Sequence, residues 1–95
     1  MKKYEVMVII NANLDDEARN GVLNGLQDVI TSNGGSVANV DEWGMRDFAY
    51  PIDHMKKGYY AVIKFAADNA CVAEFDRLTR INKHVVRHMI TVDQA

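Results

Sequence analysis

The side chains with the clearest binding chemistry are those of Trp43, Arg46 and Tyr50, which lie close together in the sequence. A guanidinium group can neutralise a phosphate, and an aromatic ring can stack on a nucleobase or anchor a protein interface. Pro51 follows Tyr50 and restricts it to an extended conformation. This segment is therefore the first candidate for a binding surface.

Further basic residues stand near the two ends of the sequence. Lys2 and Lys3 precede Tyr4, and the stretch 77–89 holds basic residues and no acid. RNA-binding surfaces combine cations with aromatic rings in this way. Each of these residues also has a structural explanation. Tyr4 could belong to the core, the two lysines could only solvate the terminus, and His88 could be a partly buried strand residue. If these segments meet in the fold, the predicted RNA contacts are Lys2, Lys3, Tyr4, Arg46, Tyr50, Arg87 and His88.

No combination of residues predicts catalysis. The sequence lacks a Gly-x-Ser-x-Gly turn, a His-Glu-x-x-His pair and a glycine-rich phosphate loop. Asp41 and Glu42 are adjacent, so in a strand their carboxylates would point to opposite faces and would not share a proton. Cys71 is the single cysteine, and the histidines lack the spacing of metal ligands. We therefore expect no enzyme activity, no metal, no cofactor and no small-molecule substrate.

Length and composition indicate one domain, residues 1–95, with 48% hydrophobic residues. The formal charge of −2, taken alone, argues against a nucleic-acid binder, but acids gather in the first third of the chain and bases gather in 77–89. The apolar run after Lys3 is too short for a signal peptide, and no apolar stretch is long enough to span a membrane. With a lone cysteine, these features predict a reducing, cytoplasmic location.

The residue pattern predicts four strands and two helices. Residues 4–10 are rich in β-branched residues, which is typical of a buried central strand. Helical spacing begins at Leu14 and ends at the Asn-Gly-Gly of 33–35, and Asp68 is the expected N-cap of the second helix. The other predicted strands span 35–48, 59–66 and 85–92, and residues 50–58 are predicted to form a loop.

The order β-α-β-β-α-β with right-handed crossovers predicts an α+β, ferredoxin-like fold. In it, two helices cover one face of a four-stranded antiparallel sheet and leave the other face open to a partner. The first strand lies between the third and the fourth, so Lys2, Lys3, Arg46 and Arg87 are expected to form one basic patch at neighbouring strand ends.

Three motifs occur in order along the chain: the basic-basic-Tyr-Glu opening at 2–5, the Gly-x-Arg-x-x-Ala-Tyr-Pro-Ile corner at 44–52 and the Arg-x-Met of 87–89. On these motifs the chain resembles the family of ribosomal protein six of the bacterial small subunit. Phe48 stands where the family usually has leucine, and Asp47 stands where it often has a basic or polar residue. The second departure puts extra phosphate contacts beside Arg46 in doubt.

The resemblance implies a non-catalytic constituent of the small ribosomal subunit. Family members bind the central domain of small-subunit ribosomal RNA together with ribosomal protein eighteen, as a heterodimer. Trp43 would contact this partner or the RNA, although packing at a sheet edge is the commoner role of a strand tryptophan. The predicted partner interface comprises Trp43, Ala49, Pro51, Ile52 and Met89.

The fold alone also permits a different class of protein. A self-associating ferredoxin-like module could bind a small ligand or regulate an enzyme, with a second copy covering its open sheet. The mass in solution separates the two hypotheses, because the ribosomal protein is expected to be a monomer that awaits its partner and the alternative is expected to be a dimer.

Overall fold

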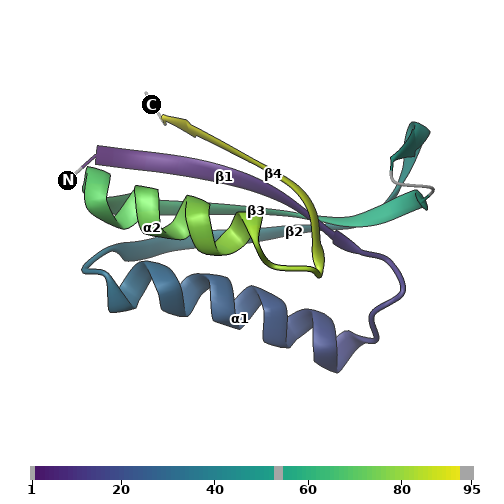
Figure 1. Ribbon diagram of the computed structural model, residues 1–95, viewed down its shortest axis with the longest axis horizontal. Helices are drawn as coiled ribbons and strands as arrows, with labels where there is room; N and C mark the ends of the chain where they lie inside the picture. The colour runs from purple at the N-terminus through teal and green to yellow at the C-terminus, as the bar shows by residue number, and fades with distance from the viewer. Residues whose placement is uncertain (1, 53–54, 93–95) are drawn as a thin grey trace.

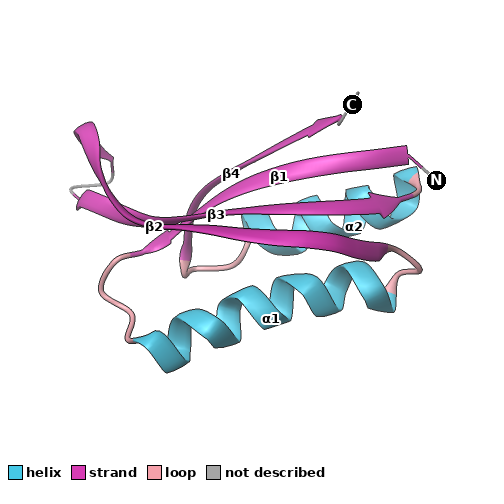
Figure 2. Cartoon of the chain, turned by 180° about the vertical axis from the view of Figure 1, so that it is seen from behind, coloured by secondary structure: helices cyan, strands magenta, loops and turns pink. Residues whose placement is uncertain are grey.

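The computed structural model describes residues 2–52 and 55–92, with side chains described for 2–47 and 57–92. Along the chain the elements are β1 (Lys2–Asn11), α1 (Asp16–Ser32), β2 (Ser36–Ile52), β3 (Met55–Ala67), α2 (Asn69–Arg80) and β4 (Val85–Val92). The strands form one antiparallel sheet in the order β2-β3-β1-β4. Both helices pack on the same face of this sheet (Figures 1 and 2). The predicted fold class and the central position of β1 are confirmed.

Side-chain caps fix where the two helices begin. The Asp15 carboxylate accepts a hydrogen bond from the backbone N–H of Ala18 at 2.7 Å, and Asp68 accepts one from Cys71 at 2.8 Å. Each cap satisfies a backbone donor that has no partner within the helix. Asp68 is therefore the N-cap that the sequence predicted.

The core lies between the sheet and the helix layer. Alternate residues of β1 and β3 point into it, as expected for strands whose successive side chains face opposite sides. Phe65 stands at its centre, with ring centroids 5.7 Å from Tyr4 and 5.6 Å from Phe75. The remaining fully or nearly buried members are Val6, Val8, Ile10, Leu23, Leu26, Ile30, Ala61, Ile63, Ala67 and Cys71.

Gly35 joins α1 to β2 at a point of close backbone approach. A Cβ atom there would lie 2.7 Å from Cγ2 of Ile30 and 3.1 Å from the carbonyl oxygen of Ala66. Glycine is therefore required for the turn to pass between the helix and the neighbouring strand.

The predicted loop at 50–58 is wrong. Strand β2 continues to Ile52, β3 begins at Met55, and these two residues pair. β1 reaches only as far as Asn11, which pairs with Gly58, so the hairpin projects beyond the rest of the sheet (Figure 1). β2 is an edge strand, where a proline is tolerated because its missing N–H is not needed by a further strand.

No helix in the described part of the chain is long and apolar enough to cross a membrane.

Candidate RNA and partner interface

The sheet face opposite the helices, called the open face below, carries side chains from all four strands. Ile9 of β1 pairs with Arg87 of β4 on one side and with Tyr60 of β3 on the other. Tyr60 in turn pairs with Gly44 of β2. Ile9, Arg87 and Tyr60 alternate with core residues along their strands, so their side chains lie in one row across the open face, and the row ends at the bare backbone of Gly44.

A second row on the open face is mostly apolar. Met7 pairs with Met89 on β4 and with Val62 on β3, and Val62 pairs with Asp41 on β2. Met89 is 54% exposed, while Val62 and Ile9 are nearly buried among their neighbours. The open face therefore offers an apolar centre next to the cation of Arg87.

Trp43 stands at the β2 edge of this face and is held by two contacts. Its ring lies parallel to that of Tyr60, with centroids 6.4 Å apart and an angle of 3° between the planes. Its indole N–H donates a hydrogen bond to Asp41 at 3.2 Å. The tryptophan nevertheless remains 46% exposed. Trp43, Tyr60 and Arg46 line a shallow hollow of about 400 Å³.

A β-bulge explains how this tryptophan reaches the surface. The pairing of β2 with β3 shifts between Glu42 and Gly44, so Trp43 is the extra residue at this point. Gly44 has a φ of 90°, in a region that is costly for residues with a side chain. Bulges of this kind redirect a side chain, and here the redirected residue is the aromatic one.

The arginines fall into two groups. Three pair with acids of their own helices: Arg19 with Asp16 at 2.6 Å, Arg80 with Asp76 at 2.7 Å, and Arg77 with Glu74. Arg46 and Arg87 are exposed, and no ion pair to either is found among the described residues. They belong to β2 and β4, at the outer edges of the sheet, so the arginines left for an anionic ligand lie on its open face.

Lys2 and Lys3 do not join this group. Lys3 pairs with Ala66, at the end of β3, whereas Arg46 pairs with Gly58, near its beginning. At ~3.3 Å per residue, these positions are roughly 25 Å apart along the strands. The predicted single basic patch is therefore split, with the two lysines at one end of the sheet and Arg46 at the other.

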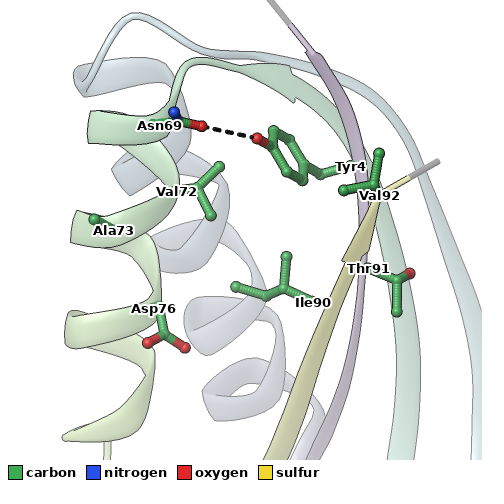
Figure 3. A pocket seen from close by; sticks show the side chains of 8 residues that line it. All are labelled: Tyr4, Asn69, Val72, Ala73, Asp76, Ile90, Thr91 and Val92. Carbon is green, nitrogen blue, oxygen red and sulfur yellow. Dashed lines mark hydrogen bonds between the residues drawn. The ribbon is translucent and has the colours of Figure 1, made fainter.

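Tyr4 belongs to the core and is 7% exposed. Its ring stacks on Phe65, and its hydroxyl donates to the Asn69 side-chain oxygen at 3.3 Å. Figure 3 shows the ring pointing into the groove between α2 and β4, with Val72 and Ile90 nearby. An RNA base cannot stack on a ring held in this position, so the core alternative for Tyr4 is the one that the structure supports.

His88 faces the helices and not the open sheet. It pairs with Val8 of the core face, and its Nε2 lies 2.7 Å from a carboxylate oxygen of Asp76 on α2. This hydrogen bond lowers the pKa of Asp76, and the nearby charge of Arg80 adds to the effect. His88, with only 13% of its side chain exposed, thus ties the edge strand to the helix and is not placed for RNA contact.

Several predicted contacts stay predictions. The side chains of Ala49, Tyr50, Pro51 and Ile52 lie outside the described residues, although their backbone belongs to β2. Tyr60, Met7 and Ile9 were missed as site residues. In a strand, residues 60, 62 and 64 share one face and residues 59, 61, 63 and 65 share the other, so the sequence pattern could have placed Tyr60 on the face opposite Phe65.

The described residues offer no other centre of chemistry. They hold no group of three or more acids, histidines or cysteines that could bind a metal ion. Cys71 is 1% exposed, and burial raises the pKa of its thiol, which disfavours the reactive thiolate. The fold and the open face therefore define a small α+β domain with an uncovered sheet that suits binding.

Known proteins are similar to this chain in fold and in sequence. The family model of ribosomal protein S6 matches residues 3–91. The chain is 43% identical over 94 residues to the small ribosomal subunit protein bS6 of Exiguobacterium sibiricum, with 99% of each chain covered. It is also similar to the crystal structure of 30S ribosomal protein S6 from Thermotoga maritima, with a TM-score of 0.92 and 29% identity, over 97% of this chain and 87% of that one.

The chain belongs to the ribosomal protein S6 family, which confirms the resemblance seen in its three motifs. It is accordingly a small-subunit ribosomal protein, located in the ribosome in the cytoplasm.

Proposed function

We propose that this protein binds the central domain of small-subunit ribosomal RNA together with ribosomal protein eighteen, as a heterodimer. It acts as a structural constituent of the subunit and carries out no catalysis. The observation that carries the proposal is the presence of two exposed arginines on the open face that have no ion-pair partner among the described residues. Arg46 and Arg87 neutralise RNA phosphates in this proposal.

The protein partner docks on the apolar part of the open face. Met89 is more than half exposed beside Met7, and methionine side chains adapt readily to a partner surface. Contiguous apolar surface with a polar rim is typical of interaction sites. Ala49, Pro51 and Ile52 are proposed to extend this interface along the projecting hairpin.

The small number of free cations explains why a partner is needed. The net charge is −2, and the helix arginines are paired with the protein's own acids. Affinity for RNA grows with the number of phosphates neutralised. Arg46 and Arg87 lie toward one end of the open face, whereas Lys3 and Lys64 lie toward the other end, so any one contact region holds few cations and supports only weak binding. A basic partner supplies further phosphate contacts and converts weak binding into a stable complex.

The test is a titration of a central-domain ribosomal RNA fragment at several salt concentrations, with this protein alone and then with the basic partner. We expect tight, salt-sensitive binding only when both proteins are present. Equal binding with and without the partner would contradict the heterodimer. A protein that is a dimer in solution and does not bind the RNA would instead favour the self-associating module.

A further inference from the structure

We propose that Trp43 is the stacking surface for one unpaired base of the RNA and that Arg46 binds the phosphate of the same nucleotide. This inference rests on the proposed function, because it assigns one element of RNA recognition to one site. It also decides between the two roles open to Trp43, contact with RNA or contact with the protein partner.

Trp43 is positioned before any ligand arrives. An exposed side chain usually keeps its rotamer freedom, and a ligand that orders it must offset the lost entropy. Here the hydrogen bond to Asp41 and the parallel ring of Tyr60 already fix the indole, although nearly half of its surface is open to solvent. A rigid, exposed aromatic plane is the feature on which unpaired bases stack.

The charge around the hollow favours a nucleotide over a basic protein side chain. Among the described residues, the hollow is lined by two aromatic rings and the guanidinium of Arg46, with no acid. Asp41 lies close by and keeps its negative charge while one of its oxygens accepts the indole N–H, so in this proposal the phosphate binds on the Arg46 side of the hollow. A nucleotide presents a flat ring and an anion together, which matches this lining. An arginine of the protein partner would meet the like charge of Arg46.

The position of the site also selects unpaired RNA. The open face is formed by a broad sheet, and a sheet cannot enter the deep, narrow major groove of an RNA helix. A base in a loop, bulge or end can turn out of its stack and lie on the indole. The hollow, at about 400 Å³, falls within the range of sites that hold small ligands.

The experiment measures the affinity of the heterodimer for the central-domain RNA fragment with Trp43→Leu and Trp43→Phe. Leucine keeps an apolar side chain but removes the stacking plane, so we expect a loss of about 5- to 150-fold. Phenylalanine keeps an aromatic ring and should retain most of the affinity. Ile81→Ala is the matched control, because Ile81 is an exposed apolar residue outside the open face, and it should bind as the wild type does.

Two further measurements complete the test. Trp43 is the only tryptophan, so the fluorescence that Trp43→Phe removes belongs to it, and stacking of a base should quench that fluorescence when RNA is added. Affinity between the two proteins without RNA should be the same for wild type and both variants. Thermal unfolding checks that each variant is folded.

The outcomes separate this inference from the proposed function. If wild type and Trp43→Leu bind RNA equally, the stacking site is refuted while the proposed function stands. If Trp43→Leu weakens the protein pair in the absence of RNA, Trp43 contacts the protein partner and the inference is overturned. If the wild-type pair does not bind the RNA, the proposed function itself fails.

Discussion

Replacing each open-face arginine by glutamine should lower the salt dependence of RNA binding by a calculable amount. Glutamine keeps polarity and much of the side-chain length but removes the charge. Each phosphate contact contributes about 0.7 to the slope of log affinity against log salt for single-stranded RNA and about 0.9 for a duplex. We therefore expect Arg46→Gln and Arg87→Gln each to reduce the slope by that amount.

The double variant should show the sum of the two effects. Arg87 lies on β4 and Arg46 on β2, at opposite edges of the four-stranded sheet. At a strand spacing of ~4.8 Å, they are roughly 14 Å apart across the sheet. This exceeds the screening length of about 8 Å at physiological salt, so the two charges act independently. The expected combined reduction in slope is about 1.4 to 1.8.

The assay is titration of the central-domain RNA with the protein pair over a series of salt concentrations. At physiological salt each single variant should lose about 4- to 6-fold in affinity, and the loss should disappear as the salt concentration approaches 1 M. Arg77→Gln is the control, because it makes the same change in net charge but removes an arginine that pairs with Glu74 on α2.

The Arg77→Gln control shows whether a lower salt slope comes from a lost phosphate contact or from the change in net charge. If Arg77→Gln lowers the slope as much as Arg87→Gln does, net charge and not a phosphate contact at the open face accounts for the effect. If Arg46→Gln and Arg87→Gln leave the slope unchanged, the arginines do not meet phosphates, and the reasoning from unpaired cations is refuted.

Two further predictions test the residues that the structure removed from the RNA site. Tyr4→Phe loses the hydrogen bond to Asn69 and should lower the free energy of unfolding by about 0.5–1.5 kcal/mol in denaturant titrations, with RNA affinity unchanged; a loss of RNA affinity at full stability would restore Tyr4 to the interface. Asp76→Asn weakens the contact with His88 and should cost roughly 0.5–1 kcal/mol at neutral pH, because a third of the Asp76 side chain is exposed. Folding lowers the pKa of Asp76, so its contribution is present above the pKa of an unfolded aspartate and is lost as the pH falls through the lowered value. The stability difference between Asp76→Asn and wild type should therefore vanish in acid, and a constant difference across the pH range would contradict this account.

The sequence predicted elements well where local signals and burial agreed. The apolar run of β1 indicated its central position, and Asp68 marked the start of α2 because an aspartate cap acts within a few residues of itself. The loop predicted at 50–58 failed for the opposite reason. Pro51 is a strong local signal for a turn, but an edge strand in a long hairpin accepts it, and the length of a hairpin depends on pairing with a distant strand.

The candidate site was harder to predict because it depends on register. The strand order predicts that Lys3 lies beside β3. It does not predict which end of β3 Lys3 meets, because that depends on the register. The antiparallel pairing puts Lys3 opposite Ala66, while Arg46 meets Gly58 at the other end. No sequence pattern predicted the bulge before Gly44. This bulge nevertheless turns Trp43 toward the open face.

The distribution of charge links the fold to the proposed heterodimer. Three arginines of the helix layer form ion pairs with acids of α1 and α2. Their charges are therefore already neutralised within the protein. The proposed function assigns RNA phosphates to the few arginines that remain on the open face, and it assigns the apolar residues between them to the protein partner. A partner that covers Met89 and adds its own cations uses both parts of this face at once. In the proposed heterodimer, weak binding by this protein alone is an advantage, because stable attachment to the RNA then requires that the two proteins have already met.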